Sequence, residues 1–520
     1  MAQFFFGHPA SFLETTGAKR MFWVPSIRRS WVQVLGLLLG WLLVVESPGF
    51  TPRGILPLSA AWAAEEFISI GSRRELFVDS LLIEQLEGVR RQLHAPQPQE
   101  VVFRFDQPWE GKFSGYITVL HNGEKFLMYY RGMPRASHDT TTEVTCLAES
   151  EDGIHWSRPK LGLFEVGGTK ENNVVLARHP ACHNFAPFFD TRPDCPPEAR
   201  YKALGGPGAP GLFAFASPDG IHWRQLQSQP VFTQGAFDSQ NNAFWSETER
   251  KYVLYFRVFR EGIRWIARTT SEDFLHWEKP VDLETGDWPM EHLYTNQIIP
   301  YPPAPHIYIG FPTRFFPGRR VLSNQEAAEI GTATEWNSVN DCTDILLVST
   351  RGGVQFHRFM EAFIRPGPDL RNWSSRANYA AQGIFQKSGE VFFYIQHHCG
   401  YPSSHLRRYT IRPDGFVSIR ADYQGGYLLT KPVIFRGSRL RINFSTSAAG
   451  CVKVELQNLQ GEPIPGFTLS ECRELIGDRL DHPVEWTSGK QVGDLAGQPI
   501  RLRFYLRDAD LFAFRFGSED

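Results

Sequence analysis

Residues 150–156 read Ser-Glu-Asp-Gly-Ile-His-Trp, and the phrase returns at residues 217–223 as Ser-Pro-Asp-Gly-Ile-His-Trp. A weaker copy follows at residues 271–277, and two fainter ones end at Phe356 and Phe416. The steps between the terminal aromatic residues are 67, 54, 79 and 60 residues. Each step is long enough for one four-stranded sheet with its loops, and imperfect repeats of this kind are typical of a β-propeller. The five copies predict five blades.

The repeated residues themselves are expected to be structural. Asp followed by Gly favours a tight turn, and the closing tryptophan is expected to pack between blades. Trp156, Trp223 and Trp277 should therefore occupy equivalent places in successive blades. Seven blades would need about 50 residues each, which the spacing does not favour.

The sequence around the repeats reads as short β-strands. Residues 115–120 and 125–130 are apolar or alternating runs, and Asn122-Gly123 between them is a strong hairpin signal. Long stretches with helical periodicity are missing from the chain. Alternating runs continue after residue 425, for example at residues 440–444, and fit a β-sandwich. The predicted fold class is all-β, with a five-bladed β-propeller over residues 65–424 and a β-sandwich accessory domain over residues 425–520.

The first 64 residues are expected to direct export. Arg28 and Arg29 precede an apolar run over residues 34–45, shorter than the roughly 20 residues that span a bilayer. Small residues suited to cleavage follow at positions 61–64. The pattern predicts a bacterial-type signal peptide and a secreted or periplasmic protein with no stable membrane partner after cleavage. A retained membrane anchor is the alternative.

Composition narrows the class of partner. The net charge of −2 gives no electrostatic footprint for nucleic acid. Aromatic residues make up 14% of the chain, which suits a β-rich core and also suits stacking against sugar rings. The seven dispersed cysteines form neither a disulfide framework nor a zinc motif, although Cys182 and Cys195 could bridge across a loop.

Three short motifs stand where the inner strands of blades should begin. Residues 184–188 read Asn-Phe-Ala-Pro-Phe, residues 235–241 read Gly-Ala-Phe-Asp-Ser-Gln-Asn, and residues 290–296 read Met-Glu-His-Leu-Tyr-Thr-Asn. With them, the stretch from about residue 75 to 420 resembles the five-bladed glycoside hydrolases related to invertases (fructosidases) and to arabinanases and xylosidases. That resemblance implies Asp238 as the blade-three carboxylate that tunes the acid, and Glu291 as the blade-four general acid.

Blade one departs from the pattern of that family. Where the family has Asp-Pro, this chain has Phe-Ser-Gly-Tyr at residues 113–116. Glu110 is the nearest candidate for the missing acid, and Asp106 and Asp79 are alternatives. Hydrolysis of a glycosidic bond needs two carboxyl groups that face each other across the substrate. The expected catalytic set is therefore Asp238, Glu291 and Glu110.

Other polar residues near the inner strands are expected to contact the sugar. These are His183, Asn184, Gln240, Asn241, His292, Tyr294, Asn296, Arg314, Arg376, Asp106 and Asp79. We expect no metal site and no cofactor. Calcium is left open, because propeller channels of this type sometimes hold it, although no ligand loop is visible in the sequence.

The sequence as a whole favours a secreted glycoside hydrolase that acts on poly- or oligosaccharides, with acidic or sulfated ones suggested by the candidate arginines. The alternative is a non-catalytic carbohydrate-binding propeller that lacks the blade-one acid. A sialidase would require six blades, and a protein-interaction propeller would lack a converging acid cluster. The resemblance thus predicts an enzyme, a glycoside hydrolase, whose partner is a carbohydrate substrate.

Overall fold

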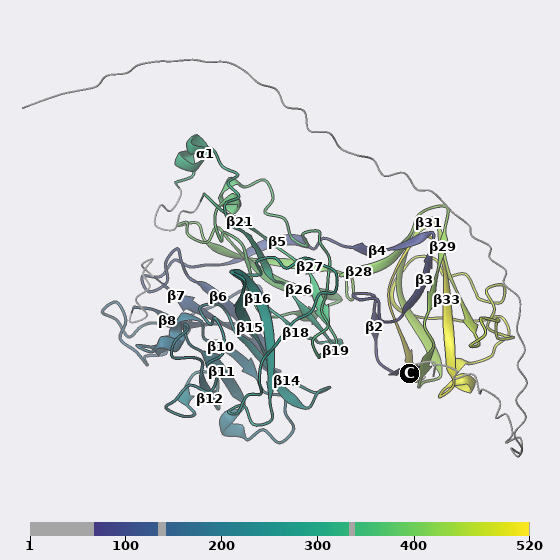
Figure 1. Ribbon diagram of the computed structural model, residues 1–520, viewed down its shortest axis with the longest axis horizontal. Helices are drawn as coiled ribbons and strands as arrows, with labels where there is room; N and C mark the ends of the chain where they lie inside the picture. Colours follow the sequence, from purple (N-terminus) through teal and green to yellow (C-terminus); the bar gives the residue numbers. More distant parts are fainter. Residues whose placement is uncertain (1–66, 134–141, 332–338, 519–520) are drawn as a thin grey trace, which may run out of the picture. The chain divides into compact units, whose positions relative to one another are not determined.

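The computed structural model describes residues 67–133, 142–331 and 339–518, and the regular secondary structure of these residues is almost entirely β-strand (Figure 1). Five antiparallel sheets, four of them four-stranded, follow one another along the chain. A short helix, α1 (Asn324–Glu329), lies on the long insertion of the fourth blade, beside the hairpin of β20 (Thr313–Phe316) and β21 (Cys342–Ile345).

In the first four blades the strands run outward in chain order, and in the fifth the outermost strand comes from earlier in the chain. The first blade is β6 (Gly115–His121), β7 (Phe126–Gly132), β8 (Val144–Ser150) and β9 (Val174–Ala177); the second is β10 (Ala186–Phe189), β11 (Tyr201–Gly205), β12 (Phe213–Ser217) and β13 (Arg224–Gln225); the third is β14 (Asn242–Ser246), β15 (Lys251–Arg260), β16 (Ile263–Ser271) and β17 (Val281–Asp282). The fourth is β18 (Ile299–Tyr301), β19 (Ala304–Gly310), β22 (Val348–Thr350) and β23 (His357–Arg358); the fifth is β24 (Tyr379–Ala380), β26 (Glu390–His397), β27 (His405–Ile411) and β5 (Gln97–Arg104), with β25 (Phe385–Lys387) also paired to β26.

The propeller is closed by a strand from the other end of its sequence. β5 precedes the first blade in the chain, yet it pairs antiparallel with β27 as the outermost strand of the fifth blade. Closure of the ring leaves no blade without two neighbours, which is how propellers protect their sheet edges. The five-bladed architecture predicted from the repeat is confirmed.

The repeated phrase forms the turn that follows the third strand of a blade. In the first copy, Asp152 Oδ1 accepts hydrogen bonds from the main-chain nitrogens of Ile154 and His155, both at 2.8 Å. Asp219 and Asp273 accept the corresponding bonds at 2.8–2.9 Å. The same local hydrogen bonds therefore recur in three blades.

The tryptophans of the first two copies contact the preceding blade. Trp156 packs edge-on against Tyr394 with ring centroids 6.0 Å apart, and Trp223 does so against Tyr129 at 6.1 Å. Tyr394 also donates a hydrogen bond of 2.6 Å to the carbonyl of Gly153. The equivalent placement of Trp156 and Trp223 between blades is confirmed, and Trp277 follows β16 in the same way.

A second domain is built on a ten-stranded, curled sheet. Its strands are β1 (Ile68–Gly71), β2 (Glu75–Leu76), β3 (Ile83–Glu87), β4 (Val89–Leu93), β28 (Val417–Ala421), β29 (Gly426–Thr430), β30 (Val433–Phe435), β31 (Arg439–Gln457), β32 (Asp478–Pro483) and β33 (Pro499–Gly517). The two long strands β31 and β33 pair along most of their length, with a register shift between Thr446 and Cys451. One apolar core, which includes Phe444, Leu502 and Phe514, fills the curl.

This domain takes strands from both ends of the described chain. β4 pairs with β28, β3 with β29, and β2 with β33. Residues 68–93, which the sequence analysis assigned to the propeller, thus belong to the C-terminal sheet. The short alternating strands of the two domains look alike in sequence, so their pattern did not reveal which sheet they join.

The seven cysteines are all free thiols, and all but Cys399 are buried. Cys182 and Cys195 therefore do not form the bridge that the sequence left open. Within the described residues, no helix is long and apolar enough to cross a membrane. The proposed signal peptide lies outside the described residues.

Candidate functional site

The inner strands of the five blades begin at one mouth of the propeller, and each blade places one polar or aromatic side chain there. In blade order these are Tyr116, His183, Asp238, Tyr294 and Tyr379. They line a cavity of about 210 Å³. The convergence follows from the fold, because the loops that enter successive inner strands meet around the central channel.

Amide side chains cross the channel beneath the cavity. Gln297 donates to Gln240 Oε1 at 2.7 Å and to the carbonyl of Ala380 at 2.8 Å. Gln240 in turn donates to Thr118 Oγ1 at 2.8 Å, and Asn242 donates to Gln297 Oε1 at 2.7 Å. These buried groups join the first, third, fourth and fifth blades, so the cavity ends on a hydrogen-bonded floor.

The cavity carries an excess of positive charge. Arg131, Arg264 and Arg376 line it, whereas Asp238 is its only carboxylate among the described residues. Asp238 forms an ion pair with a further arginine, the buried Arg257. Arg131 and Arg264 make no ion pair with any carboxylate in the described part of the chain. Burial and the nearby charges of Arg257 and Arg376 lower the pKa of Arg264, partly offset by Tyr294.

The tyrosines of the mouth differ in their ease of ionisation. Burial would raise the pKa of Tyr294, but the charges of Arg376 and Arg257, with hydrogen bonds from Arg376 and Tyr116, bring that pKa below its usual value. Burial and the neighbouring Tyr294 raise the pKa of Tyr116, and burial raises that of Tyr379. One phenol of the cluster is therefore poised to lose a proton while its neighbours keep theirs.

His183, the histidine of the second blade, contacts a buried carboxylate. Glu143, which immediately precedes the third strand of blade one, is fully buried, and its Oε2 lies 2.9 Å from His183 Nδ1. Arg131 lies 3.5 Å from the same ring nitrogen and stacks 4.5 Å above the ring of Tyr116. These contacts orient both side chains toward the cavity.

Three residues of the mouth have left-handed backbone conformations although they are not glycine. The φ angles are +50° at Tyr116, +55° at Arg376 and +50° at Gln297. Such conformations cost about 1–3 kcal/mol each and cluster at functional sites. The surrounding fold holds each of these side chains at the channel at the expense of local stability.

Four of the residues expected from the sequence are brought together here: Asp238, His183, Tyr294 and Arg376. Another four lie behind the cavity as buried supports. Asn184 Nδ2 donates to the carbonyl of Ser239 at 2.7 Å, and Asn241 Nδ2 donates to the same oxygen at 2.8 Å. Together they fix the loop that carries Asp238. Gln240 and Asn296 belong to the floor network.

Glu291 stands apart from the cavity. Its carboxylate pairs with the buried Arg358 and lies 3.8 Å from Arg314, which itself forms a two-point ion pair with Asp344 at 2.7 and 2.9 Å. Neither Glu291 nor Arg314 lines the mouth cavity. His292, which follows in the sequence, has its Nδ1 3.3 Å from the backbone nitrogen of Arg264.

The three candidates for a blade-one acid do not face Asp238 either. Glu110 is fully buried, where it binds Arg158 at 2.7 Å and accepts a hydrogen bond of 2.6 Å from Tyr130. Asp106 is exposed on the other side of Arg158, at 3.3 Å. Asp79, between β2 and β3, pairs at 2.6 Å with Arg351, which follows β22 of the fourth blade. Their arginine partners hold these carboxylates in ion pairs outside the cavity.

The sequence analysis missed several residues of the cavity. Arg131 and Arg264 sit on second and third strands, where sequence alone does not say which face meets the channel. Tyr116 occupies the blade-one position that was expected to hold an acid. The sequence signal for this residue was therefore the missing Asp-Pro at residues 113–116. Tyr379 begins the fifth inner strand but lacks a flanking motif.

Metal ligation has no support within residues 67–133, 142–331 and 339–518, since no cluster of three His, Cys, Asp or Glu side chains there could hold an ion. In the mouth, the single described carboxylate already faces Arg257. These residues do not make a calcium site, which needs six to eight oxygen ligands.

Comparison with known proteins yields similarities of fold at low sequence identity. No protein-family model matches the chain, and no curated protein matches it. An N-acetylgalactosamine deacetylase from F. plautii, solved with blood group B trisaccharide, is 14% identical over 61% of this chain and 94% of that one, with a TM-score of 0.40. A glycosyl hydrolase from Bacteroides ovatus is 13% identical over 66% and 94%, with a TM-score of 0.38.

A glycoside hydrolase family 43 arabinoxylan arabinofuranohydrolase from Bacillus subtilis, solved with cellotetraose, covers more of the chain. It is 9% identical over 82% of this chain and 99% of its own, with a TM-score of 0.37. Glycoside hydrolases are thus among the solved structures to which this chain is similar, as its sequence resemblance predicted.

Proposed function

We propose that the mouth of the propeller binds an acidic saccharide, a sugar chain that carries carboxylate or sulfate groups. The observation that carries the proposal is the imbalance of charge: three arginines line the cavity against one carboxylate in the described lining. Guanidinium groups bind carboxylates and sulfates through paired, charge-assisted hydrogen bonds. An anion in the cavity would also counter the burial and the repulsion from Arg257 and Arg376 that together lower the pKa of Arg264.

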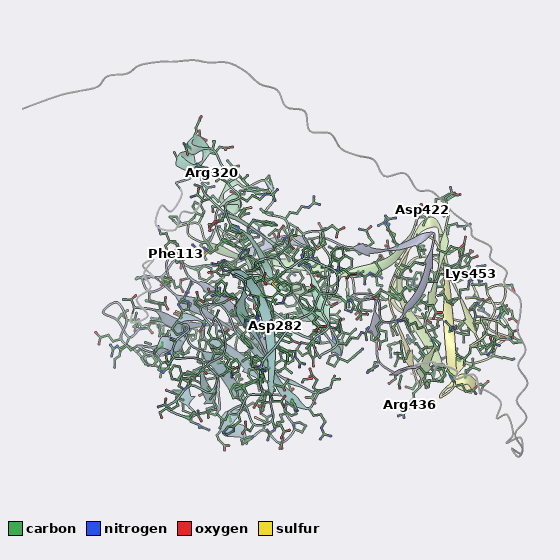
Figure 2. The ribbon with its side chains drawn as sticks, viewed as in Figure 1. Phe113, Asp282, Arg320, Asp422, Arg436 and Lys453 are labelled. Carbon is green, nitrogen blue, oxygen red and sulfur yellow. The ribbon has the colours of Figure 1, made fainter. Side chains whose placement is uncertain are left out.

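The aromatic residues of the mouth fit a saccharide rather than a bare anion. Tyr116, Tyr294, Tyr379 and Phe113, the last labelled in Figure 2, offer ring faces and edges to the apolar side of a pyranose. Their hydroxyl groups can bond to sugar hydroxyls. The hydrogen-bonded floor under the cavity favours the end of a chain over its middle, because a polymer could not thread through.

Binding is tested with matched acidic and neutral oligosaccharides by isothermal titration calorimetry at several salt concentrations. We expect saccharides that end in a hexuronate or a sulfated sugar to bind, with affinity that falls as salt rises, and neutral counterparts to bind at least tenfold more weakly. Equal affinity for neutral and acidic chains, or no binding of any acidic chain, would contradict the proposal.

Hydrolysis by a carboxylate pair is the second candidate function. The observation that favours it is the exposure of Asp238, whose side chain is 58% accessible on the cavity side of its loop. Glu291, the acid that the resemblance implied, lies outside this cavity, so under this mechanism Asp238→Asn should lower turnover by about 10²–10⁴-fold, as expected for loss of an acid or base, and Glu291→Gln should not. A Glu291→Gln variant with unchanged turnover would remove Glu291 from the mechanism, and an inactive Asp238→Asn variant would keep Asp238 in it.

We also propose that the protein works outside the cytoplasm, as its N-terminal sequence suggests. Arg28 and Arg29 with the apolar run 34–45 support export, and an extracellular or periplasmic location would bring the mouth to polymeric sugars. Cell fractionation, with N-terminal sequencing of the exported form, tests this. Cleavage near residues 61–64 is the expected result, and full-length protein in the cytoplasm would contradict it.

A further inference from the structure

We propose that this mouth cleaves a hexuronate glycoside by β-elimination, with Tyr294 accepting the proton at C5 and Tyr116 protonating the departing oxygen at C4. The inference deepens the proposed function, since it requires that an acidic saccharide binds in the cavity. It assigns the bond cleavage to two phenols and the arginines around them.

The geometry places one phenol among cations. Tyr294 is 7% exposed, and the guanidinium carbons of Arg257 and Arg264 lie 5.2 and 5.3 Å from the centroid of its ring. Arg376 lines the same cavity. A phenolate at this position would be stabilised by three positive charges in a partly dry cavity, where such charges act more strongly than in water.

The second phenol lines the same cavity as the first. The hydroxyl of Tyr116 donates to the main-chain carbonyl of Asp238 at 3.0 Å. Tyr379 packs against both rings, with centroids 6.4 Å from Tyr116 and 5.8 Å from Tyr294. The two hydroxyl groups therefore meet at the same cavity from the first and fourth blades.

The two phenols have opposite tendencies, which assigns their roles. The arginines favour the charged form of Tyr294, whereas burial beside Tyr294 keeps Tyr116 protonated. Groups whose environments push their pKa values apart in this way make an acid and a base. Tyr294 then starts the reaction as the base and Tyr116 as the acid.

The reaction balances without water, metal or redox partner. The Tyr294 phenolate takes the proton from C5, and the C5–H electron pair forms a double bond between C4 and C5. The C4–O bond breaks, its electrons go to the departing oxygen, and Tyr116 supplies the proton that oxygen needs. The products are a sugar chain with a new free end and an unsaturated uronate. Proton transfer from Tyr294 to Tyr116 then restores both groups.

The arginines explain why the substrate should be a uronate. A C5 proton is acidic enough for a phenolate only when the adjacent carboxylate is neutralised, because the carbanion formed there spreads its charge onto that group. Arg131 and Arg264, which have no carboxylate partner in the described part of the chain, are placed to do this. A sulfated neutral sugar would bind without providing an acidic C5–H.

The reaction is tested on oligosaccharides that contain galacturonate, glucuronate, mannuronate, guluronate or iduronate. Elimination gives new reducing ends and, in equal amount, a C4=C5 double bond conjugated with the carboxylate, which absorbs in the ultraviolet; hydrolysis gives reducing ends alone. We expect both products in a one-to-one ratio on at least one uronate. Reducing ends without ultraviolet absorbance, or a bound uronate that is never cleaved, would overturn the inference while the binding proposal stands.

Two variants then test the assignment of the phenols. Tyr294→Phe and Tyr116→Phe should each lower turnover by at least about 100-fold, in line with general acid–base catalysis, with substrate affinity changed less than fivefold. Tyr294→Phe should also abolish exchange of the C5 proton with deuterated solvent, whereas Tyr116→Phe should retain it. Tyr423→Phe, at a tyrosine that is 65% exposed on the C-terminal domain, is the matched control and should behave as wild type. Unchanged turnover in Tyr294→Phe would overturn the inference, and failure of every acidic saccharide to bind would overturn the proposed function itself.

Discussion

The hydroxyl of Tyr116 donates a hydrogen bond of 3.0 Å to the main-chain carbonyl of Asp238, linking the first blade to the third across the mouth. Tyr116 stands where a resembling glycoside hydrolase would carry an acid, and Asp238 is the carboxylate that the resemblance best located. The mouth thus places a phenol beside the loop of Asp238, where the sequence resemblance implied a second carboxylate. The phenol at this position is the chemical reason why bond cleavage in this cavity would use groups other than a carboxylate pair.

Removal of one arginine of the cavity should weaken the binding of acidic saccharides. Arg264→Gln is expected to raise the Kd about 10- to 100-fold, because a hydrogen bond to a charged group is worth about 1.5–3 kcal/mol. Its affinity should also depend less on salt. Arg260→Gln removes an exposed arginine of the same blade, paired with Asp282 (labelled in Figure 2), and is the control expected to bind normally. Equal losses in both variants would indicate a nonspecific effect of charge.

Glu110 is expected to matter for stability. Glu110→Gln leaves Arg158 without its buried partner, and we expect a loss of about 3 kcal/mol in the free energy of unfolding, the low end for a buried pair because Arg158 is 23% exposed. Glu171→Gln, in an exposed pair with Lys160, should leave the denaturation midpoint unchanged. A stable but inactive Glu110→Gln protein would instead restore Glu110 as a candidate catalytic acid.

The turn of the repeat leaves no room for a side chain. At Gly153 the φ angle is +79°, and a Cβ atom would lie 2.8 Å from Tyr394 Oη. At Gly123 the φ angle is +99°, but no atom lies within 4 Å of the added Cβ. Both alanine variants bear the strain of a left-handed backbone, and Gly153→Ala should lose about 1–3 kcal/mol more from overpacking. Chemical denaturation of the two variants measures the difference.

Acid should destabilise the fifth blade through His397. Burial, with the neighbouring His405 and His398, lowers the pKa of His397 to about 3. Its ring is held neutral by Asn378 Oδ1 at 2.8 Å and Tyr409 Oη at 2.9 Å. The unfolded chain takes up a proton near pH 6.5 and the folded chain does not, so stability is full above that pH and falls between pH 6.5 and 3.

The measurement is the free energy of unfolding as a function of pH. The slope from this group approaches about 1.4 kcal/mol per pH unit in that window. His397→Gln, which cannot be protonated, should be less stable than wild type at pH 7 and should lose less stability on acidification. A parallel decline of the two proteins would show that His397 does not titrate between folded and unfolded states as inferred.

Truncation should reveal the shared construction of the C-terminal sheet. A chain that ends at residue 424 loses β29 to β33 and leaves β2 and β3 without their partners. We expect it to be poorly soluble, since Ile70, Phe77 and Leu82 would lose their core. A chain over residues 97–415, which also lacks β1 to β4, should be the more soluble of the two. The reverse order would contradict the strand assignment.

The fold could be predicted from the sequence to the extent that it rests on local turns. The phrase that ends in Trp156 encodes its own hydrogen bonds through Asp152 and Gly153, so its copies located the blades. The loop of Asp238 is likewise a short local motif. The arginines could not be predicted, because the face on which Arg131 and Arg264 project depends on the pairing of their strands. For the same reason, the sequence did not reveal that β1 to β4 join the C-terminal sheet.

The pairing of β5 with β27, which closes the propeller, also determines when the propeller can close during synthesis of the chain. Gln99 on β5 bonds Thr410 on β27 at 2.9 Å, although the two residues are 311 positions apart in the chain. At translation speeds of about 5–20 residues per second, β5 waits roughly 15–60 s after its own synthesis before its partner emerges. During that interval it is an unpaired strand open to wrong partners. The propeller therefore loses its exposed strand edges only when the fifth blade has formed. A ribosome-bound nascent chain would have to be shielded until then.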